Sequence, residues 1–361
     1  MGILDTIRKN STIKDSELLS KSKFFQKKDM ITTSIPAINI ALSGKIDGGL
    51  TPGLTMWAGP SKHFKTAFSL LMAKSYLDKY KDAALLFYDS EFGTPQSYFD
   101  AFGIDTERVL HTPVTDVEQL KFDIMKQLAG VERGDHIMII IDSIGNLASK
   151  KEVEDTLDGK SVADMSRAKQ IKSLFRMVTP HLSLKDIPMV VVNHTYKTME
   201  MYSKDVVGGG TGSYYSADNI FILGRQQDKD GTELMGYNFI INVEKSRYVR
   251  EKSKIPVTVK FNGGISKWSG LLDMALELGF VIKPSVGWYS HVDVATGEIA
   301  EKKYRVKDTD TKEFWEPIIT NKAFQEAIKK RYQIAVSKIM SDDNIDEELA
   351  KIEDDIDVPE V

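Results

Sequence analysis

Four mainly apolar runs occur in the first 200 residues of this chain. The runs are LTMWAG, which ends at Gly59, AALLFYD at 83–89, HIMIIIDS at 136–143 and PMVVVN at 188–193. Runs of this length without apolar–polar alternation are typical of strands that are buried on both faces of a parallel sheet. The segments between them, above all 65–80 and 161–184, have apolar positions spaced as in helices. The alternation predicts an α/β fold with a mainly parallel central sheet.

The rest of the pattern predicts smaller elements. We expect a helix near 15–25, a stretch rich in turn residues at 32–53 and a short helix at 95–103. Segment 115–128 favours a helix that opens with a capping box formed by Thr115 and Glu118. GYNFIINVEKS and KIPVTVKFNGG favour antiparallel strands. LLDMALELGFV and EFWEPIITNKAFQEAIKKRY favour a small helical second domain beyond about residue 270.

Composition narrows the class of protein. The chain has no cysteine, which excludes disulfides, a thiol nucleophile and a cysteine-ligated metal, and makes a reducing cytosol the simplest location. No apolar run reaches membrane length and the N-terminus carries charges throughout, so we expect a soluble cytoplasmic protein without a membrane partner. The formal net charge is −4, yet the last 21 residues hold ten Asp or Glu against one Lys. This acidic tail is either a solvating segment or an arm that competes with DNA for a basic groove.

The octapeptide GPSKHFKT lies between the first predicted strand and a helix. A phosphate-binding loop has Gly, four residues, then Gly-Lys-Ser/Thr, and its backbone N–H groups approach phosphate oxygens. Gly59, Lys65 and Thr66 fit this pattern, whereas Phe64 stands at the second glycine position, so an ordinary strand-to-helix turn is the alternative. In such a loop the Lys ammonium reaches the β- and γ-phosphates and the hydroxyl binds Mg²⁺. The residues assigned to nucleotide phosphates are Gly59, Pro60, Ser61, Lys62, His63, Phe64, Lys65 and Thr66.

A polar residue or glycine follows each of the predicted core strands. These residues are Gly59, Glu91, Asp142, and Asn193 with His194. Because the carboxyl ends of parallel strands meet at one edge of the sheet, we expect a ligand site there. Asp142 strengthens the phosphate-loop hypothesis as the carboxylate that supports Mg²⁺. Glu91 is suited to orient and deprotonate an attacking water, although a residue at that place can also be a cap or an ion-pair partner.

Two long connections carry glycines and cations. VVGGGTGS, at 206–213, lies in a connection of about 20 residues after His194, which we expect to be structureless and either functional or passive. Glycines let a backbone lie against a sugar-phosphate chain, and Lys197 and Tyr196 supply a cation and a stacking face. The connection after Asp142 leads to Arg167 and Lys172, which would hold phosphates or form a solvated helix face.

VEKSR, at 243–247, places Lys245 and Arg247 two residues apart on a predicted strand, hence on one face. Two neighbouring cations repel unless an anion lies between them. That anion would be a surface carboxylate or the γ-phosphate bound to a neighbouring subunit.

Five of these stretches occur together in one known family. GPSKHFKT, LFYDSEFG, IIIDSIGNLASKKE, INVEKSR and GLLDMALELGF follow one another in the order and spacing of RecA/Rad51-type recombinases. The chain resembles this family along nearly its whole length, and in particular the recombinases of T4-like bacteriophages. The resemblance implies a RecA-type P-loop ATPase that uses ATP and Mg²⁺, forms helical filaments on single-stranded DNA, and catalyses homologous pairing and strand exchange with double-stranded DNA. It also implies a phage single-strand DNA-binding protein and a recombination mediator as partners, in the cytoplasm of the host cell.

The resemblance assigns roles to individual residues. Glu91 matches the catalytic carboxylate, and Tyr98 matches the Tyr that stacks on adenine. His194 stands where the family has a Gln that senses the γ-phosphate, and a His also donates a hydrogen bond to phosphate. Lys245 and Arg247 match a pair of lysines that reach the ATP of the adjacent subunit. Gly209, Gly210 and Thr211 match the family's second loop, which touches DNA. Together with the cations named above, Arg167, Lys172 and Lys197, they are the positions that we expect to contact DNA.

Phe64 agrees with the resemblance, because the matching position is not glycine in the phage members either. We expect its backbone in a region open to ordinary residues and its ring turned away from the phosphates. The expected organisation is an N-terminal oligomerisation segment at 1–34, an ATPase core with two DNA-binding loops at 35–268, a small domain at 269–340 and the acidic tail at 341–361. The alternatives are a hexameric helicase on the same core and a nucleotide-gated DNA-binding scaffold with little turnover.

Overall fold

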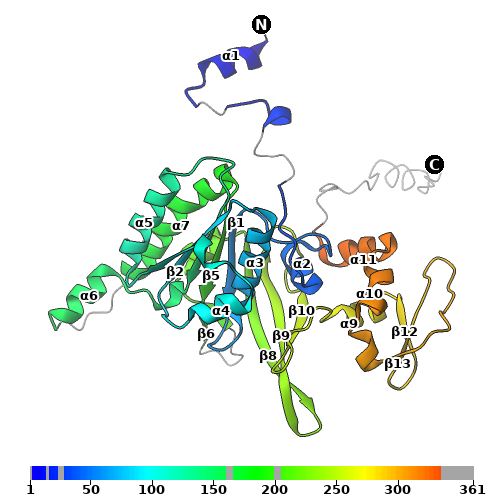
Figure 1. Cartoon of the computed structure of the whole chain (residues 1–361). Helices are drawn as coiled ribbons and strands as arrows, with labels where there is room; N and C mark the ends of the chain where they lie inside the picture. Colours follow the sequence, from blue (N-terminus) through cyan, green and yellow to red (C-terminus); the bar gives the residue numbers. More distant parts are fainter. Residues whose placement is uncertain (1, 14–15, 23–27, 160–165, 199–204, 335–361) are drawn as a thin grey trace, which may run out of the picture.

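The computed structural model describes residues 2–13, 16–22, 28–159, 166–198 and 205–334. Within these ranges the centre is a nine-stranded sheet in the order β11-β10-β9-β8-β1-β5-β4-β2-β3 (Figure 1). The strands from β8 to β3 in this order are parallel, and β9, β10 and β11 continue the sheet antiparallel. The bounds are β1 Gly53–Ala58, β2 Ala84–Asp89, β3 Val109–Pro113, β4 Ile137–Asp142, β5 Pro188–Asn193, β8 Asn219–Asp230, β9 Glu233–Ser246, β10 Lys254–Lys260 and β11 Gly264–Ile265.

The four apolar runs form β1, β2, β4 and β5, which confirms the α/β class and the mainly parallel sheet. Both faces of these strands are buried because helices cover them. On one face, α2 (Pro36–Ser43) and α3 (Lys65–Lys79) pack with Trp57 and Phe221. On the other, α5 (Val117–Ala129) and α7 (Ser166–Lys185) pack with Met56 and Ile139.

The elements predicted for the first 53 residues agree with the structure only in part. A helix, α1 (Ile3–Asn10), precedes the expected one and buries none of its residues, and in Figure 1 it stands apart from the sheet. The helix expected near 15–25 lies partly outside the described residues, and the described part holds only the 3₁₀ turn η1 (Leu19–Lys21). The turn-rich stretch contains α2, whose eight residues are all buried and therefore show no amphipathic period.

The helical connections also differ in part from the prediction. The short helix α4 (Gln96–Ala101) is confirmed, and η3 (Thr106–Arg108) leads from it to β3. The capping box at Thr115 is wrong, because Asp116 is the N-cap and accepts a hydrogen bond from the Gln119 N–H at 2.8 Å. Glu118 instead accepts from the Lys150 N–H at 3.0 Å, at the start of α6 (Lys150–Leu157). A tertiary contact therefore uses the side chain that the local pattern assigned to the cap.

The glycine-rich connection is structured wherever it is described. β6 (Thr195–Lys197) and β7 (Asp205–Val207) form an antiparallel pair, and α8 (Thr211–Ser216) follows and packs on α7. The expectation of a structureless loop was wrong for these residues. Within the described part of the chain, no helix combines the length and apolar character that crossing a membrane requires.

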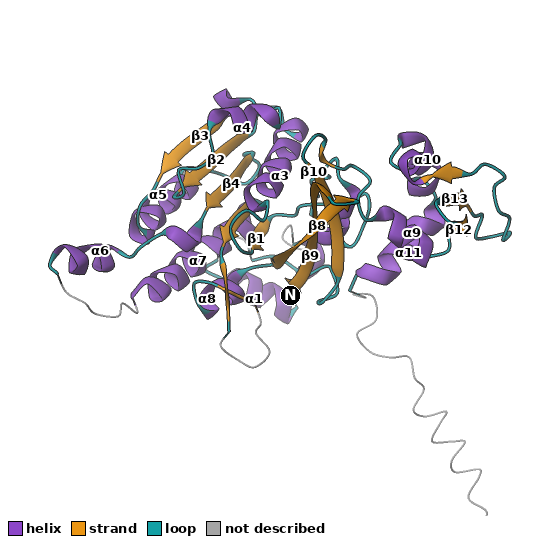
Figure 2. Cartoon of the chain, turned by 90° about the horizontal axis from the view of Figure 1, so that it is seen from below, coloured by secondary structure: helices purple, strands orange, loops and turns teal. Residues whose placement is uncertain are grey.

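The region beyond β11 combines the predicted helices with a sheet that the sequence pattern did not indicate. It holds α9 (Leu271–Glu277), β12 (Val281–Ser285), β13 (Trp288–His291), β14 (Tyr304–Arg305), η5 (Val306–Thr309), α10 (Lys312–Ile319) and α11 (Lys322–Tyr332). The three strands are antiparallel in the order β12-β13-β14. Seen from below, this unit lies beside the core, beyond β10 (Figure 2). The domain boundaries stay predictions.

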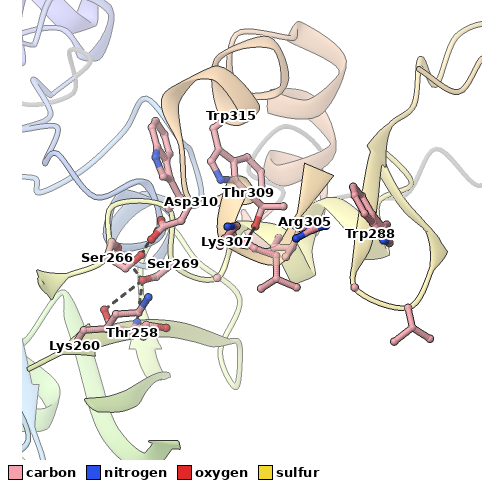
Figure 3. A pocket seen from close by; sticks show the side chains of 16 residues that line it. Thr258, Lys260, Ser266, Ser269, Trp288, Arg305, Lys307, Thr309, Asp310 and Trp315 are labelled. Atoms are coloured by element: carbon pink, nitrogen blue, oxygen red, sulfur yellow. Dashed lines mark hydrogen bonds between the residues drawn. The ribbon is translucent and has the colours of Figure 1, made fainter. Parts of the chain in front are cut away.

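A pocket of about 900 Å³ separates this unit from the edge of the core (Figure 3). Lys260 lines it from β10, and Trp288, Arg305 and Trp315 line it from the C-terminal side. A hydrogen bond joins the two sides of the pocket, since the Thr258 N–H of β10 donates to Ser269 Oγ, beyond β11, at 2.9 Å. The two units thus meet through polar contacts as well as through the apolar cluster that they share.

Candidate active site at the ends of the parallel strands

Residues 59–66 form the loop between β1 and α3, where the sequence predicted a phosphate-binding loop. Lys65, the first residue of α3, is 6% exposed, and its Nζ donates to the carbonyl oxygens of Gly59 at 3.1 Å and Pro60 at 2.8 Å. Burial lowers the pKa of Lys65 below its ordinary value, while Glu91 and Asp142 oppose the shift. The ammonium group is therefore held inside its own loop by neutral carbonyl acceptors, which negatively charged phosphate oxygens can replace.

The backbone prediction for Phe64 was wrong. Phe64 has φ 60° and ψ 17°, the left-handed conformation that a glycine adopts without steric cost and a bulky residue rarely adopts. The prediction that its ring avoids the phosphates fits the contacts, since the ring packs on Phe239, with centroids 5.1 Å apart, and on Phe68 at 6.3 Å. The loop thus has the shape that glycine usually provides, although the residue is phenylalanine.

Thr66 and Asp142 meet beside the loop. Thr66 Oγ1 donates to Asp142 Oδ2 at 2.6 Å, and Asp142 is 1% exposed at the end of β4. Its second oxygen, Oδ1, has no hydrogen-bond partner among the described residues. Burial is the main cause that raises the pKa of Asp142, to about 6. A hydroxyl beside a buried, half-satisfied carboxylate is a donor set that suits Mg²⁺, which prefers oxygen ligands and keeps several waters.

Glu91 accepts two hydrogen bonds on the same oxygen. Ser143 Oγ donates to Oε1 at 2.7 Å, and His194 Nε2 lies 3.0 Å from that oxygen. The His194 contact is the main cause that holds the pKa of Glu91 below its ordinary value, and burial opposes it. Three neighbouring strands, β2, β4 and β5, therefore place these side chains together, as the topology predicted. A charged carboxylate with its second oxygen available is suited to orient and deprotonate a water molecule.

Asp89 positions the turn that carries Glu91, and the sequence reasoning missed it. Its Oδ1 accepts from the N–H groups of Glu91 at 3.0 Å and Phe92 at 2.8 Å, and its Oδ2 lies 3.2 Å from His111 Nε2. The signal was available, because an Asp followed by two residues in a turn commonly accepts from their backbone.

Asn193 links His194 to the glycine-rich segment. Its Nδ2 donates to the Gly208 carbonyl at 2.8 Å, and its Oδ1 accepts from the His194 N–H at 2.8 Å. The Gly208 N–H donates in turn to the His194 carbonyl at 2.9 Å. Gly145 leaves room for the His194 ring, because a Cβ there would lie 2.5 Å from His194 Cδ2. A displacement of His194 must therefore either move Gly208 or break these hydrogen bonds.

Comparison with known proteins decides the class. A model of the RecA N-terminal domain matches residues 4–266, and one described as "Bacteriophage T4, Recombination and repair protein, C-terminal domain" matches 268–328. The "Recombination and repair protein" of Enterobacteria phage T4 is 56% identical over 330 residues, covering 90% of this chain and 84% of that protein. The chain belongs to the RecA family of recombinases. Proteins named RecA from Bacteroides thetaiotaomicron and Streptomyces rimosus are 26% identical over 275 and 267 residues, covering 75% and 73% of this chain and 80% and 68% of theirs.

The residues predicted to contact DNA have mixed surroundings. Arg167 donates to the carbonyl oxygens of Ile144, Gly145 and Leu147, at 2.5–3.1 Å, so its guanidinium is already engaged inside the chain. This contact holds η4 (Ile144–Asn146), against which His194 packs, and favours a positioning role over a phosphate contact.

The other DNA candidates lie around α7 and α8. Lys172 abuts α8, because a Cβ at Gly212 would lie 2.5 Å from its Cβ. Lys197 is exposed on β6, and Gly209 and Gly210 have φ of 88° and 75°, which suits glycine. Thr211 begins α8. Lys204 and Tyr202, which the sequence offers as a further cation and stacking face of the glycine-rich connection, lie outside the described residues. So do Phe24 and Phe25 of the predicted oligomerisation segment, and the acidic tail.

Lys245 and Arg247 lie at the end of β9, and both have hydrogen-bond or ion-pair partners in the same chain. Lys245 Nζ donates to the Tyr214 carbonyl at 2.8 Å and the Tyr215 carbonyl at 3.2 Å, and Arg247 pairs with Asp218. For Arg247, the surface carboxylate that the sequence offered as one alternative is thus present.

Tyr98 and His63 are two further residues that were assigned to the nucleotide. Tyr98 lies on α4, packs against Phe102 with centroids 5.6 Å apart, and has its pKa raised by burial. His63 Nδ1 lies 2.9 Å from the Ser61 carbonyl, and burial lowers its pKa. The adenine role of Tyr98 stays a prediction.

Proposed function

We propose that this RecA-family protein is a DNA-dependent ATPase that forms helical filaments on single-stranded DNA and pairs that DNA with a homologous duplex. The observation that carries the proposal is the convergence of Lys65, Thr66 and Asp142 with Glu91 and His194 at one edge of the sheet. The relative from phage T4 is named for recombination and repair, which supports the same process in a host cell's cytoplasm.

The chain's own residues suffice for the chemical roles. Lys65 leaves its carbonyl acceptors to hold the β- and γ-phosphates of ATP, with the N-terminus of α3 behind it. Thr66 and Asp142 would hold Mg²⁺, which when bound neutralises charge on the phosphates. Glu91 accepts a proton from the attacking water as the water oxygen bonds to the γ-phosphorus, and the bond from that phosphorus to the β–γ bridging oxygen breaks to release ADP.

Filament assembly has its own support. The helix α1 exposes Ile3, Leu4 and Ile7 at 75%, 61% and 60%, an apolar group on a helix that buries nothing in its own chain. We infer that a neighbouring subunit covers it. Lys245 and Arg247 would exchange their intrachain partners for the ATP of that neighbour, so that nucleotide bridges two subunits.

Steady-state ATP hydrolysis with and without single-stranded DNA tests the proposal. We expect hydrolysis that DNA stimulates, and its loss in Lys65→Ala. Lys74→Ala is the matched control, because Lys74 lies on the same helix and pairs with Asp78. An unstimulated wild type, or an active Lys65→Ala, would refute the assignment. Electron microscopy with ATP and DNA separates helical filaments from the closed rings of a helicase.

The low-turnover scaffold retains one supporting observation, the left-handed backbone at Phe64. It predicts nucleotide-dependent DNA binding with hydrolysis no faster than in Glu91→Gln. The hydrogen bonds that keep Glu91 charged favour hydrolysis instead.

A further inference from the structure

The phosphate-binding loop contacts the β8–β9 hairpin through residues 62–64, and two of these contacts act at residues with a left-handed backbone. Phe64 packs its ring on Phe239 of β9, and Arg225 of β8 donates from Nη1 to the Lys62 carbonyl at 3.2 Å. Arg225 and Phe239 are cross-strand partners in the β8–β9 register. The two contacts therefore come from one place on the hairpin and hold the loop from two sides. We call these four residues the hairpin brace.

We propose that Phe64 is a positioning residue for ATP, whose ring, together with Arg225, braces the phosphate-binding loop against the β8–β9 hairpin and so sets the affinity for nucleotide. This inference rests on the proposed function, because it concerns the same ATP site. It differs from a reading in which Phe64 is merely tolerated where other loops have glycine.

The backbone of the loop gives the first reason. Lys62 and Phe64 both have positive φ, 61° and 60°, a conformation that non-glycine residues adopt at a cost. Such a conformation persists only where contacts elsewhere in the structure hold it. The two contacts of the hairpin brace act at these two residues, one on the carbonyl of Lys62 and one on the ring of Phe64.

The surroundings of the brace give the second reason. Phe239 is 1% exposed and Phe68, the other neighbour of the Phe64 ring, is fully buried, so the ring is anchored in the core. Arg225 is exposed and lies over the ring of Tyr237, 4.6 Å from its centroid, which fixes the direction of its guanidinium. Because an exposed hydrogen bond contributes little and an aromatic pair more, the ring should carry most of the effect.

The brace touches the loop but none of the residues at Glu91. Glu91, Ser143 and His194 come from the ends of β2, β4 and β5, and their side chains contact one another rather than the brace. Loss of the brace should therefore let the loop populate conformations that do not bind ATP, which lowers affinity by the lost fraction. The chemical step in the bound complex should be almost unchanged.

Equilibrium binding of ATP with Mg²⁺, measured without DNA, tests the brace in the full chain. Phe64→Gly restores the usual glycine and relieves the left-handed backbone, so a tolerated Phe predicts unchanged or tighter binding. The brace predicts binding about five- to tenfold weaker, with KM for hydrolysis raised by the same factor and kcat within twofold. Arg225→Met should weaken binding about twofold.

A double-mutant cycle and a matched control complete the test. Phe239→Leu should weaken ATP binding in the wild-type chain and have a clearly smaller effect in Phe64→Gly, because the contact with the Phe64 ring is then gone and the edge contact with the His63 ring, at 6.3 Å, remains. Phe261→Leu is the control, since Phe261 packs on Tyr237, with centroids 5.7 Å apart, at the exposed side of the same cluster. It should leave ATP binding unchanged.

The outcomes separate the inference from the proposed function. A wild type that binds no ATP overturns both. A wild type that binds ATP, with Phe64→Gly binding as tightly or the cycle strictly additive, overturns the brace alone. If Phe239→Leu fails to fold, judged by thermal melting, Phe64→Gly and Arg225→Met still decide, because they change a loop and an exposed side chain.

Discussion

Replacing Asp142 by Asn should stabilise the nucleotide-free protein at pH 8. Burial raises the pKa of Asp142 from 3.8 to about 6 in the folded chain. Between these values the unfolded chain releases the proton while the folded chain keeps it, so stability falls as pH rises from about 4 to 6 and stays lower above. At about 1.4 kcal/mol for each pKa unit, the carboxylate costs about 3 kcal/mol at pH 8.

Asn removes the charge and keeps an oxygen that accepts from Thr66 Oγ1, the contact that Asp142 makes at 2.6 Å. Its amide N–H group loses water as an acceptor on burial, which offsets part of the gain. We therefore expect Asp142→Asn to be more stable than wild type by about 1–3 kcal/mol at pH 8, and this advantage to shrink by about 2 kcal/mol near pH 4.

Urea unfolding without nucleotide at pH 4.5, 6 and 8 measures this difference. Asp78→Asn is the control, because Asp78 is exposed on α3 and should change stability by less than about 0.5 kcal/mol at each pH. A difference that does not vary with pH, or a variant less stable than wild type at pH 8, would show that the buried charge is not the cause. The same variant should bind ATP with a weaker dependence on Mg²⁺, since the carboxylate that supports the ion is gone.

Three further predictions concern catalysis, its stimulation by DNA and the affinity for DNA. Asp89→Ala should lower kcat about tenfold with KM for ATP within twofold in steady-state assays, because it frees the turn that carries Glu91. Asn193→Ala should keep hydrolysis without DNA but lose most of its stimulation by single-stranded DNA, since Nδ2 no longer holds Gly208. Truncation after Met340 should tighten DNA binding at 50 mM salt, measured by fluorescence anisotropy, and the gain should shrink as salt screens the acidic tail.

The sequence predicted the elements whose physical cause is local. β1, β4 and β5 were predictable because strands buried on both faces must be apolar throughout, and the topology of parallel strands then brought Asp142 and His194 to one edge. The helix α2 was not predicted because it is buried on all sides, and a helix without a polar face has no amphipathic period in its sequence.

Side chains whose partners are distant in sequence were not predictable. Arg167 was assigned to DNA as a cation beside a loop, but its guanidinium serves three main-chain carbonyls of the chain itself. The backbone of Phe64 was assigned an ordinary conformation, because nothing in the octapeptide reveals that Phe239, 175 positions along the chain, receives its ring. The contacts of both side chains depend on partners that the local sequence does not reveal, and a DNA contact of Arg167 stays a prediction.

The hydrogen bond between His194 and Glu91 gives the proposed ATPase a way to sense its nucleotide. His194 Nε2 offers one N–H, so it can donate to Glu91 Oε1 or to a phosphate oxygen, but not to both in full. If the γ-phosphate takes that donor, Glu91 keeps the bond from Ser143 and gains an acceptor site for water. The ring moves with its backbone, whose N–H and carbonyl are bonded to Asn193 and Gly208. Competition between Glu91 and the γ-phosphate for the His194 N–H would therefore free Glu91 to accept a proton from water and would shift the glycine-rich segment in the same step. A DNA-stimulated ATPase requires this kind of coupling.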